Sequence, residues 1–258
     1  MIELIAHRGY SSRNPENTLA SFDDAVNSGF PYIELDVHLS NDSVPIVMHD
    51  DSVNRTTNGS GLISELSLEQ IKDLDAGSWF DKKFSSEKVP TFEEVLARYK
   101  HRAHIFVEIK SDEEYLLKCI KEVWDKSLGD VSNKQDDSRS RLPIPGISII
   151  SFLPNQILKS KQIFPDAPLH GLLLLSSATE DVSFCVSNGI EGFLPYIGNL
   201  NKEVVELAHQ SGLYVGAWGF SSPDEISAAM ELNLDGITID WPELAYSKIS
   251  SIKEGGKA

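Results

Sequence analysis

The feature that most constrains the fold of this chain is a regular alternation of short apolar segments with amphipathic segments of helical period. The apolar segments predict eight strands, at residues 3–7, 32–39, 104–110, 147–152, 169–175, 191–196, 214–220 and 235–240. Helical patterns lie between them, for example at residues 17–27, 92–99, 113–127, 155–164, 202–210 and 222–232. Pro15 fits the first turn of the first helix, with Asn14 as its N-cap. Eight strands separated by helices predict an α/β fold, a (β/α)8 TIM-type barrel, in which active sites lie at the C-terminal ends of the strands.

The chain is predicted to form one barrel domain over residues 1–258, because 41% of its residues are hydrophobic and nothing in it resembles a domain linker. Residues 51–88 are long for a connection between a strand and a helix, and they carry the aromatic residues Trp79 and Phe80. We expect this segment to be a cap inserted over the barrel mouth. Residues 129–146 are rich in Ser, Asp, Asn, Lys and Pro, and are predicted to form a surface loop.

Two acidic side chains share one face of the second predicted strand. Residues 30–39 read F-P-Y-I-E-L-D-V-H-L, in which apolar residues alternate with Glu34, Asp36 and His38. Because side chains of a strand alternate between its faces, Glu34 and Asp36 project from the same face. Taken alone, the pattern is as typical of a half-exposed strand as of a functional site.

A predicted hairpin places a histidine beside this acidic pair. A turn cluster at residues 41–44 leads into a second apolar strand at residues 44–48. With the turn centred between Asp42 and Ser43, the paired positions sum to 85, so that Asp36 lies opposite His49. We therefore expect His49 to face a metal ion or substrate held by the acidic pair.

A third carboxylate lies at the end of another predicted strand. Residues 104–110 read H-I-F-V-E-I-K, which places Glu108 and Lys110 on one face at the C-terminal end. An ion pair at a strand end is common and contributes little. Three carboxylates at strand ends without cysteine nevertheless form an oxygen-only set, which suits Mg²⁺ or Ca²⁺ rather than zinc or copper. Lys110 and Arg8 would supply the positive charge that a phosphate group needs beside such an ion.

Charge and composition exclude several classes of partner. The formal net charge of −16 argues against a nucleic-acid partner and against a basic membrane-binding face. No apolar run is long enough for stable membrane insertion, and the first six residues are too short for a signal peptide, so a cytoplasmic location is expected unless a leader has been removed. Cys119 and Cys185 are interpreted as reduced packing residues. The motifs that bind nucleotide cofactors do not occur, and the sequence leaves the oligomeric state open.

The motifs along the chain resemble those of the glycerophosphodiester phosphodiesterase family. The resemblance begins with His7-Arg8, Pro15-Glu16-Asn17-Thr18, Glu34-x-Asp36 and His49-Asp50. It continues through residues 107–110 (V-E-I-K), Ser151-Phe152, Trp218 and residues 235–242 (D-G-I-T-I-D-W-P). The resemblance therefore covers essentially the whole chain. It implies that residues 51–103 correspond to the insertion that this family carries between its second histidine and its third metal ligand.

The resemblance implies metal-dependent hydrolysis of a small glycerophosphodiester substrate to sn-glycerol 3-phosphate and an alcohol. The residues it implicates are the metal ligands Glu34, Asp36 and Glu108, the general acid–base residues His7 and His49, and the phosphate- or substrate-binding residues Arg8, Lys110 and Trp218. The implied cofactor is a divalent metal, Mg²⁺ or Ca²⁺. Gly219 departs from the family pattern, because a hydroxyl residue usually follows the tryptophan, and this puts the substrate preference in question.

Three alternatives stay open at the level of sequence. A related phosphodiesterase could act on lysophospholipids or choline-headgroup lipids, and a wide apolar surface at residues 79–84 would distinguish it. A Schiff-base aldolase barrel could use Lys110 as its nucleophile, although the neighbouring Glu108 and a metal ion favour the protonated amine. A non-catalytic protein that binds a metal or a sugar phosphate would not need His49 opposite the acidic pair. The residues do not assign which histidine is the acid, or whether a glycerol hydroxyl attacks before water.

Overall fold

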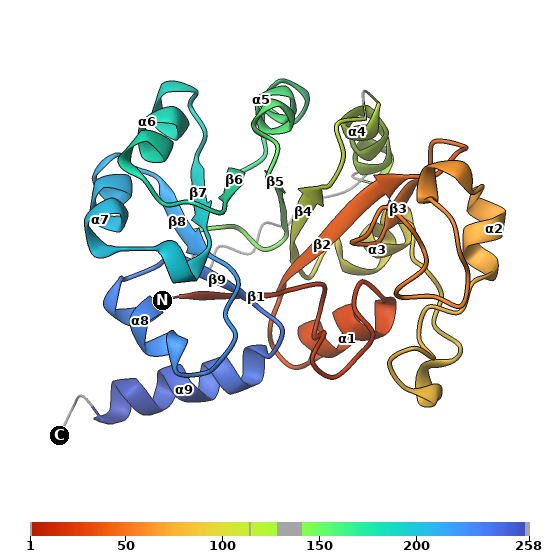
Figure 1. The fold of residues 1–258 in the computed structure, drawn as a ribbon, viewed down its shortest axis with the longest axis horizontal. Helices are drawn as coiled ribbons and strands as arrows, with labels where there is room; N and C mark the ends of the chain where they lie inside the picture. Colours follow the sequence, from red (N-terminus) through yellow and green to blue (C-terminus); the bar gives the residue numbers. More distant parts are fainter. Residues whose placement is uncertain (1, 114, 128–140, 256–258) are drawn as a thin grey trace.

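The computed structural model describes residues 2–113, 115–127 and 141–255 and forms a closed parallel barrel (Figure 1). The sheet order is β1-β9-β8-β7-β6-β5-β4-β2-β3, and pairing of β1 with β2 closes the ring. The barrel strands are β1 (Glu3–Ala6), β2 (Tyr32–Leu39), β4 (His104–Ile109), β5 (Gly146–Ser151), β6 (His170–Leu174), β7 (Gly192–Pro195), β8 (Tyr214–Ala217) and β9 (Gly236–Ile239). The short strand β3 (Pro45–Val47) pairs antiparallel with β2 and lies outside the ring. The predicted eight-stranded TIM-type barrel is therefore confirmed.

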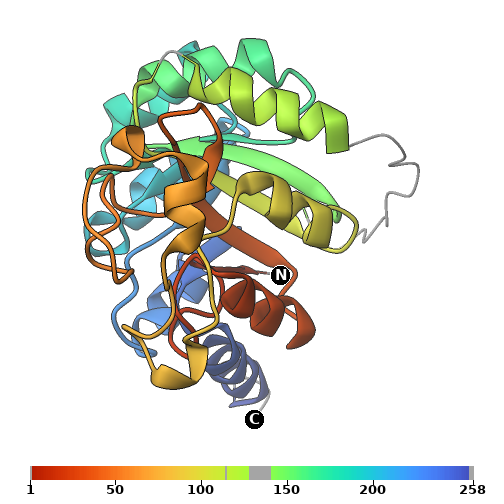
Figure 2. The same cartoon turned by 90° about the vertical axis from the view of Figure 1, so that its right-hand side faces the viewer.

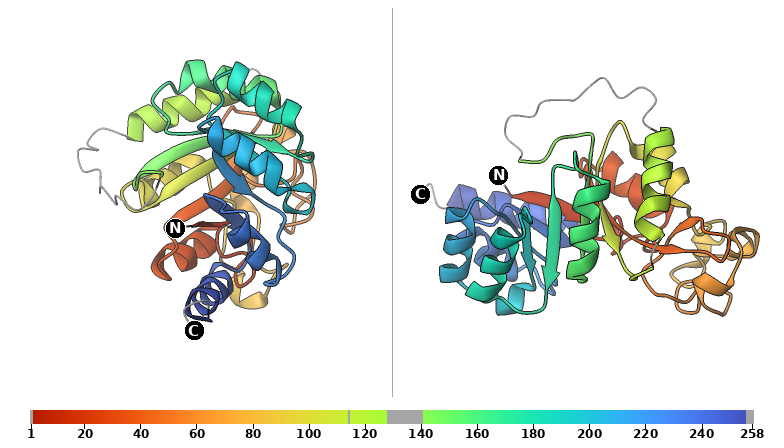
Figure 3. Two further views of the ribbon diagram at one scale, coloured as in Figure 1. Left: turned by 90° about the vertical axis from the view of Figure 1, so that its left-hand side faces the viewer. Right: turned by 90° about the horizontal axis from the view of Figure 1, so that it is seen from above.

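Helices surround the strands (Figures 1 and 3). They are α1 (Leu19–Asn27), α3 (Phe92–Tyr99), α4 (Leu116–Ser127), α5 (Pro154–Ile163), α6 (Thr179–Ser187), α7 (Lys202–Gln210), α8 (Glu225–Glu231) and α9 (Pro242–Gly255). Alternate strand residues such as Leu35 and Val107 pack outward into one apolar core with helix residues such as Phe22. The intervening positions face the barrel interior, where Tyr32 and Phe106 belong to a second, smaller cluster. Every second residue from Tyr32 and from Phe106 therefore points inward.

The first helix begins later than the sequence predicted. Asn14 is not its N-cap: α1 starts at Leu19, and the Thr18 side chain accepts a hydrogen bond from the backbone N–H of Ser21 at 3.3 Å. The predicted start was wrong because Asn17 has a φ of +55°, a left-handed conformation that no helix continues through. Pro15 lies in the turn that precedes the helix.

The hairpin register also differs from the prediction by one residue. Val37 pairs with Val47, and the backbone N–H of Met48 donates to the carbonyl of Asp36 at 3.0 Å. Asp36 therefore lies opposite Met48 and not His49. The cause is a loop of three residues, 41–43, whose last residue, Ser43, has a φ of +60°. A three-residue hairpin loop with a left-handed third residue centres the turn on its middle residue. Strand β3 ends at Val47, and His49 stays next to β2 because its carbonyl lies 3.0 Å from His38 Nε2.

The segment at residues 51–88 folds against the hairpin as a small unit of its own, beside β2 and β3 (Figure 2). It contains the short helices η1 (Ile63–Glu65), α2 (Leu68–Asp73) and η2 (Lys82–Phe84). Its apolar side chains, including Ile63 and Ile71, form a separate cluster with Ile46 of β3. Most of the predicted surface loop at residues 129–146 lies outside the described residues. Within the described part of the chain, no helix has the length and apolar character needed to cross a membrane.

Candidate functional site

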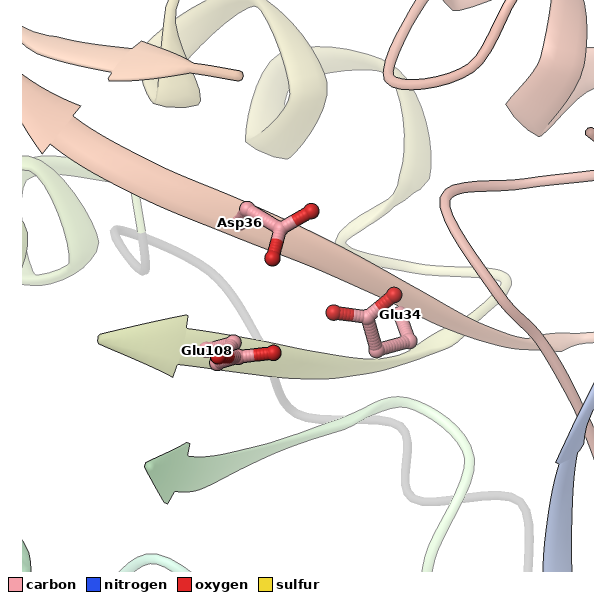
Figure 4. Close-up of side chains that lie close together, drawn as sticks. All are labelled: Glu34, Asp36 and Glu108. Atoms are coloured by element: carbon pink, nitrogen blue, oxygen red, sulfur yellow. The ribbon is translucent and has the colours of Figure 1, made fainter. Parts of the chain in front are cut away.

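Three carboxylates meet inside the barrel, two from the middle of β2 and one from near the C-terminal end of β4 (Figure 4). Glu34 and Asp36 occupy alternate positions of β2, and the parallel register places Glu108 of β4 beside Asp36. One oxygen of each carboxylate lies within 4.8 Å of the other two, and all three residues are buried. The period of the strand and the register of the parallel pair thus assemble the predicted trio.

Burial and mutual repulsion raise the pKa values of two of these carboxyl groups. Burial, together with the charges of Asp36 and Glu108, raises the pKa of Glu34 well above its ordinary value. Burial and Asp36 raise the pKa of Glu108 to about 7. For Asp36, burial acts in the same direction, but Arg8 and Lys110 outweigh it and hold the pKa of Asp36 below its ordinary value. The fully ionised trio is therefore unfavourable by itself, and a bound cation would stabilise it.

The trio also offers oxygens that no hydrogen bond satisfies. Within the described residues, Glu34 Oε1 and Asp36 Oδ1 are buried without a hydrogen-bond donor. Such atoms are costly unless another partner is present. A divalent cation would be that partner, and an all-oxygen donor set suits Mg²⁺ or Ca²⁺. The residues present therefore fit a hard metal ion.

Two cations border the carboxylates. The backbone N–H of Arg8 donates to Glu34 Oε2 at 2.9 Å, and Arg8 Nε lies 3.4 Å from Asp36 Oδ2. Lys110 Nζ donates to Glu108 Oε1 at 2.8 Å and lies 3.5 Å from Asp36 Oδ1. Although burial acts to lower it, the charges of Glu108 and Asp36 raise the pKa of Lys110. The amine is therefore held in its charged form.

Asn17 orients the central carboxylate. Its side-chain amide donates to Asp36 Oδ2 at 2.8 Å, and both residues are buried. Asn17 has the left-handed backbone that prevents α1 from starting there. The same conformation directs its side chain toward Asp36.

Each of the two predicted histidines is paired with a carboxylate through its Nδ1 atom. His7 Nδ1 lies 2.7 Å from Asp240 Oδ1, and His49 Nδ1 lies 2.7 Å from Asp50 Oδ1. Ser11 also donates to Asp240. An ionised carboxylate only accepts hydrogen bonds, so Nδ1 of each ring carries a proton and Nε2 is the atom left for chemistry.

His49 lies in the electrostatic field of the carboxylates despite the shifted hairpin register. Burial lowers its pKa, Asp36 acts in the opposite direction, and Arg8 and Lys110 lower it further. The hydrogen bond from Arg55 is the largest influence on Asp50 and holds the pKa of that carboxyl well below its ordinary value. The pair therefore consists of an ionised Asp50 and a histidine that is neutral at neutral pH.

Trp218 lies in an aromatic group that follows the ends of β5, β7 and β8. Its ring packs edge-on against Phe152 with centroids 5.2 Å apart, and it lies tilted against Tyr196 with centroids 5.3 Å apart. Gly219 has a φ of +85°, and a Cβ atom there would lie 2.4 Å from the Tyr196 ring. Glycine at this position therefore follows from the backbone conformation and from the space that Tyr196 occupies.

The structure divides the predicted site residues into two sets. Arg8, Glu34, Asp36, Glu108 and Lys110 contact one another directly. His7, His49 and Trp218 instead make the contacts described above with residues to which the sequence assigned no role.

Several residues that support this group had no role predicted from the sequence. They are Glu16, Asn17, Asp50, Arg55 and Asp240. The position of Asp50 directly after His49 was a usable signal, as was the place of Asp240 at the end of the strand that pairs with β1. Nothing in the sequence pattern distinguishes Arg55.

Comparison with known proteins identifies the family. The sequence profile of the glycerophosphoryl diester phosphodiesterase family matches residues 7–244. The chain belongs to this family. A glycerophosphodiester phosphodiesterase of Caldanaerobacter subterraneus is 32% identical over 261 residues, with 98% of both chains covered. Another protein of that name, from Bacillus subtilis, is 31% identical, and the match covers 95% of this chain and 85% of that protein.

A solved structure extends the likeness to the whole fold. It is an Oleispira antarctica phosphodiesterase in complex with the product sn-glycerol-3-phosphate. It superposes with a TM-score of 0.83 at 27% identity and covers 96% of each chain. The family and its barrel fold, both expected from the sequence motifs, are therefore confirmed for this chain.

Proposed function

We propose that this protein hydrolyses glycerophosphodiesters to sn-glycerol 3-phosphate and an alcohol, with a divalent metal ion as cofactor. The observation that carries the proposal is the buried trio of Glu34, Asp36 and Glu108, bordered by two cations and carrying two oxygens without a donor. The family of the chain and the product bound to its Oleispira relative support the same reaction.

Glu34, Asp36 and Glu108 would hold Mg²⁺ or Ca²⁺. When bound, such an ion supplies positive charge to a nonbridging phosphate oxygen and acts as a Lewis acid. Asn17 keeps Asp36 in its orientation by donating to the second oxygen of that carboxylate. Ordering of a ligand through a hydrogen-bonded neighbour of this kind is usual for metal sites.

Arg8 and Lys110 would bind the phosphate. The chain as a whole has a formal charge of −16 and repels an anionic substrate, so the attraction must come from groups within the site. Arg8 offers a planar fork of donors and Lys110 a compact charge, and both lie against the trio. This position lets the same two cations contact the carboxylates and the phosphate.

His49 would act as general base and His7 as general acid, each through Nε2. A base must be unprotonated before the reaction, and burial lowers the pKa of His49. His7 would give its proton to the departing alcohol. Asp240 and Asp50 would hold the two rings in the tautomer that these roles need.

We also propose that residues 51–103 act as a cap within a single domain over residues 1–258. The segment packs on the hairpin that carries His49, and its Arg55 reaches Glu16 in the loop before α1. The cap would restrict the alcohol that enters, because Trp79 and Phe80 remain partly exposed on it.

The first test is a panel of substrates with and without chelator. Release of sn-glycerol 3-phosphate from glycerophosphocholine and glycerophosphoethanolamine should stop in EDTA and return with Mg²⁺ or Ca²⁺. Glu34→Gln should raise the metal concentration that is needed. Preference for lysophosphatidylcholine would favour the lipid-directed alternative, and full activity in excess EDTA would contradict the metal proposal. The aldolase alternative is disfavoured because the pKa of Lys110 is raised.

The second test assigns the two histidines. His7→Ala and His49→Ala should each lower kcat by at least ~10²-fold while the fold is retained. A nitrophenyl ester has a leaving group that needs little protonation, so it should restore turnover to His7→Ala and not to His49→Ala. The reverse pattern would exchange the two roles. Near-parental turnover in both variants would show that neither histidine is an acid or a base.

A further inference from the structure

Arg55 connects two carboxylates that support different parts of the site. Its Nε and Nη2 donate to Asp50 at 2.8 and 3.0 Å. Its Nη1 and Nη2 donate to Glu16 at 2.7 and 2.8 Å. The guanidinium therefore binds one carboxylate with each of two edges, an arrangement that uses four of its five N–H donors.

Each of these carboxylates also binds a residue of the proposed machinery. Asp50 accepts from His49 Nδ1 at 2.7 Å. Glu16 accepts from Arg8 Nη1 at 2.7 Å. The chain of contacts thus runs from His49 through Asp50, Arg55 and Glu16 to Arg8. It joins three separate segments: the loop before α1, the end of the hairpin and the inserted segment.

The burial of these groups separates this arrangement from an ordinary surface ion pair. The side chains of Glu16 and Asp50 are only 13% and 28% exposed, while that of Arg55 is 43% exposed. Exposed pairs contribute little because water screens them and the side chains lose freedom. Here two largely covered carboxylates share one cation, and without it their negative charges would face each other beside His49.

We propose that Arg55 is a positioning residue: it holds Asp50 against His49 and Glu16 against Arg8, so that one guanidinium orients both the second histidine and the phosphate-binding arginine. This inference rests on the proposed function of the site for its effect on catalysis. The geometry of the contacts is independent of that function. Arg55 does not contact the carboxylate trio, and it acts only through the residues that it holds.

The test compares Arg55→Ala and Arg55→Lys with the control Arg98→Ala. Arg98 also binds one carboxylate, Asp23, through two nitrogens, and it is 51% exposed on α3. With glycerophosphocholine, Arg55→Ala should lower kcat ~10–100-fold, as loss of a neighbour that orients an active-site group usually does. Arg55→Lys should retain more activity, because a single ammonium can reach one of the two carboxylates. Arg98→Ala should stay within ~2-fold of the parent.

Two further measurements separate positioning from a structural role. Added guanidinium or methylguanidine should restore part of the activity of Arg55→Ala, because the half-exposed side chain leaves an accessible space. The ¹⁵N shifts of His49, assigned with His49→Gln, should report a single Nδ1-protonated tautomer in the parent and a mixture in Arg55→Ala. Parental kcat together with unchanged shifts would overturn the inference, as would lost activity with unchanged shifts and no chemical rescue. If the parent hydrolyses no phosphodiester, the proposed function fails, and the tautomer measurement still decides the role of Arg55.

Discussion

Glu108→Gln provides a test of the charge balance in the carboxylate trio, because it should stabilise the protein without metal and destabilise it with metal. Burial and the neighbouring Asp36 raise the pKa of Glu108 from 4.5 to about 7. At 1.36 kcal/mol for each pH unit, this rise corresponds to about 3 kcal/mol. Glutamine has the shape of the protonated acid and carries no charge.

The direction of the pH dependence follows from the sign of this rise. A carboxyl whose pKa is higher in the folded state favours folding in its protonated form. Its contribution is fully present below pH 4.5 and is lost as the pH rises through about 7. In EDTA, the parent should therefore lose stability as the pH rises from 4.5 to 8, while Glu108→Gln should not show this loss. Relative to the parent, the free energy of unfolding of Glu108→Gln should thus increase by up to about 3 kcal/mol over this range. For a chain of this size that is a rise in Tm of roughly 6–12 °C.

A bound metal ion should reverse the order of stability of the parent and Glu108→Gln. A ligand that binds only the folded state stabilises it by mass action, and the parent retains all three charged carboxylates for this binding. At pH 8 in excess Mg²⁺, the parent should unfold at the higher temperature. Thermal melts at both pH values, with EDTA or Mg²⁺, measure this directly, with Glu122→Gln on the exposed face of α4 as control. A Glu108→Gln variant that is less stable than the parent at pH 8 in EDTA would refute the reasoning from buried charge.

Two further predictions concern residues with left-handed backbone. Asn17→Ala and Asn17→Gly should both weaken Mg²⁺ activation ~10-fold, because both lose the hydrogen bond to Asp36; only the alanine variant should lose a further ~1 kcal/mol of stability, measured by denaturant unfolding, because of its φ of +55°. Gly219→Ser should destabilise by about 1–3 kcal/mol, because its Cβ meets the Tyr196 ring. Tyr196→Ala should partly relieve this loss in a double variant, and additive effects would contradict a direct clash.

The fold was predictable from sequence because its determinants are periodic. Strands buried on both faces and amphipathic helices alternate along the chain, and the eight predicted strands are the eight that form the barrel. The errors occur where a single residue adopts a left-handed backbone. Asn17 delays the start of α1, and Ser43 shifts the hairpin register by one residue. Asparagine is one of the residue types that adopt positive φ more often, and neither Asn17 nor Ser43 changes the hydrophobic pattern that carries the prediction.

The carboxylate trio was predictable for a related reason. Glu34 and Asp36 share a face because strands have period two, and Glu108 joins them because parallel strands meet at one edge. The supporting contacts were not predictable in this way. The pairing of His7 with Asp240 spans nearly the whole chain and depends on closure of the barrel through β1 and β9. The contact of Arg55 with Glu16 depends on how the inserted segment folds back.

The two histidine–carboxylate pairs have the same geometry, so the difference between their proposed roles must come from their surroundings. Each ring is held by a bond of 2.7 Å from Nδ1, which leaves the same Nε2 atom for proton transfer. His49 is partly buried and lies near the charges of Arg8 and Lys110, and these lower its pKa although Asp36 opposes them. Burial is the largest cause of the lowered pKa, and the same cations that would bind the phosphate add to its effect. In the proposed mechanism, phosphate binding and base activation would be linked through shared charges, and the position of Arg8, which Glu16 contacts and Arg55 would help to set, would affect both.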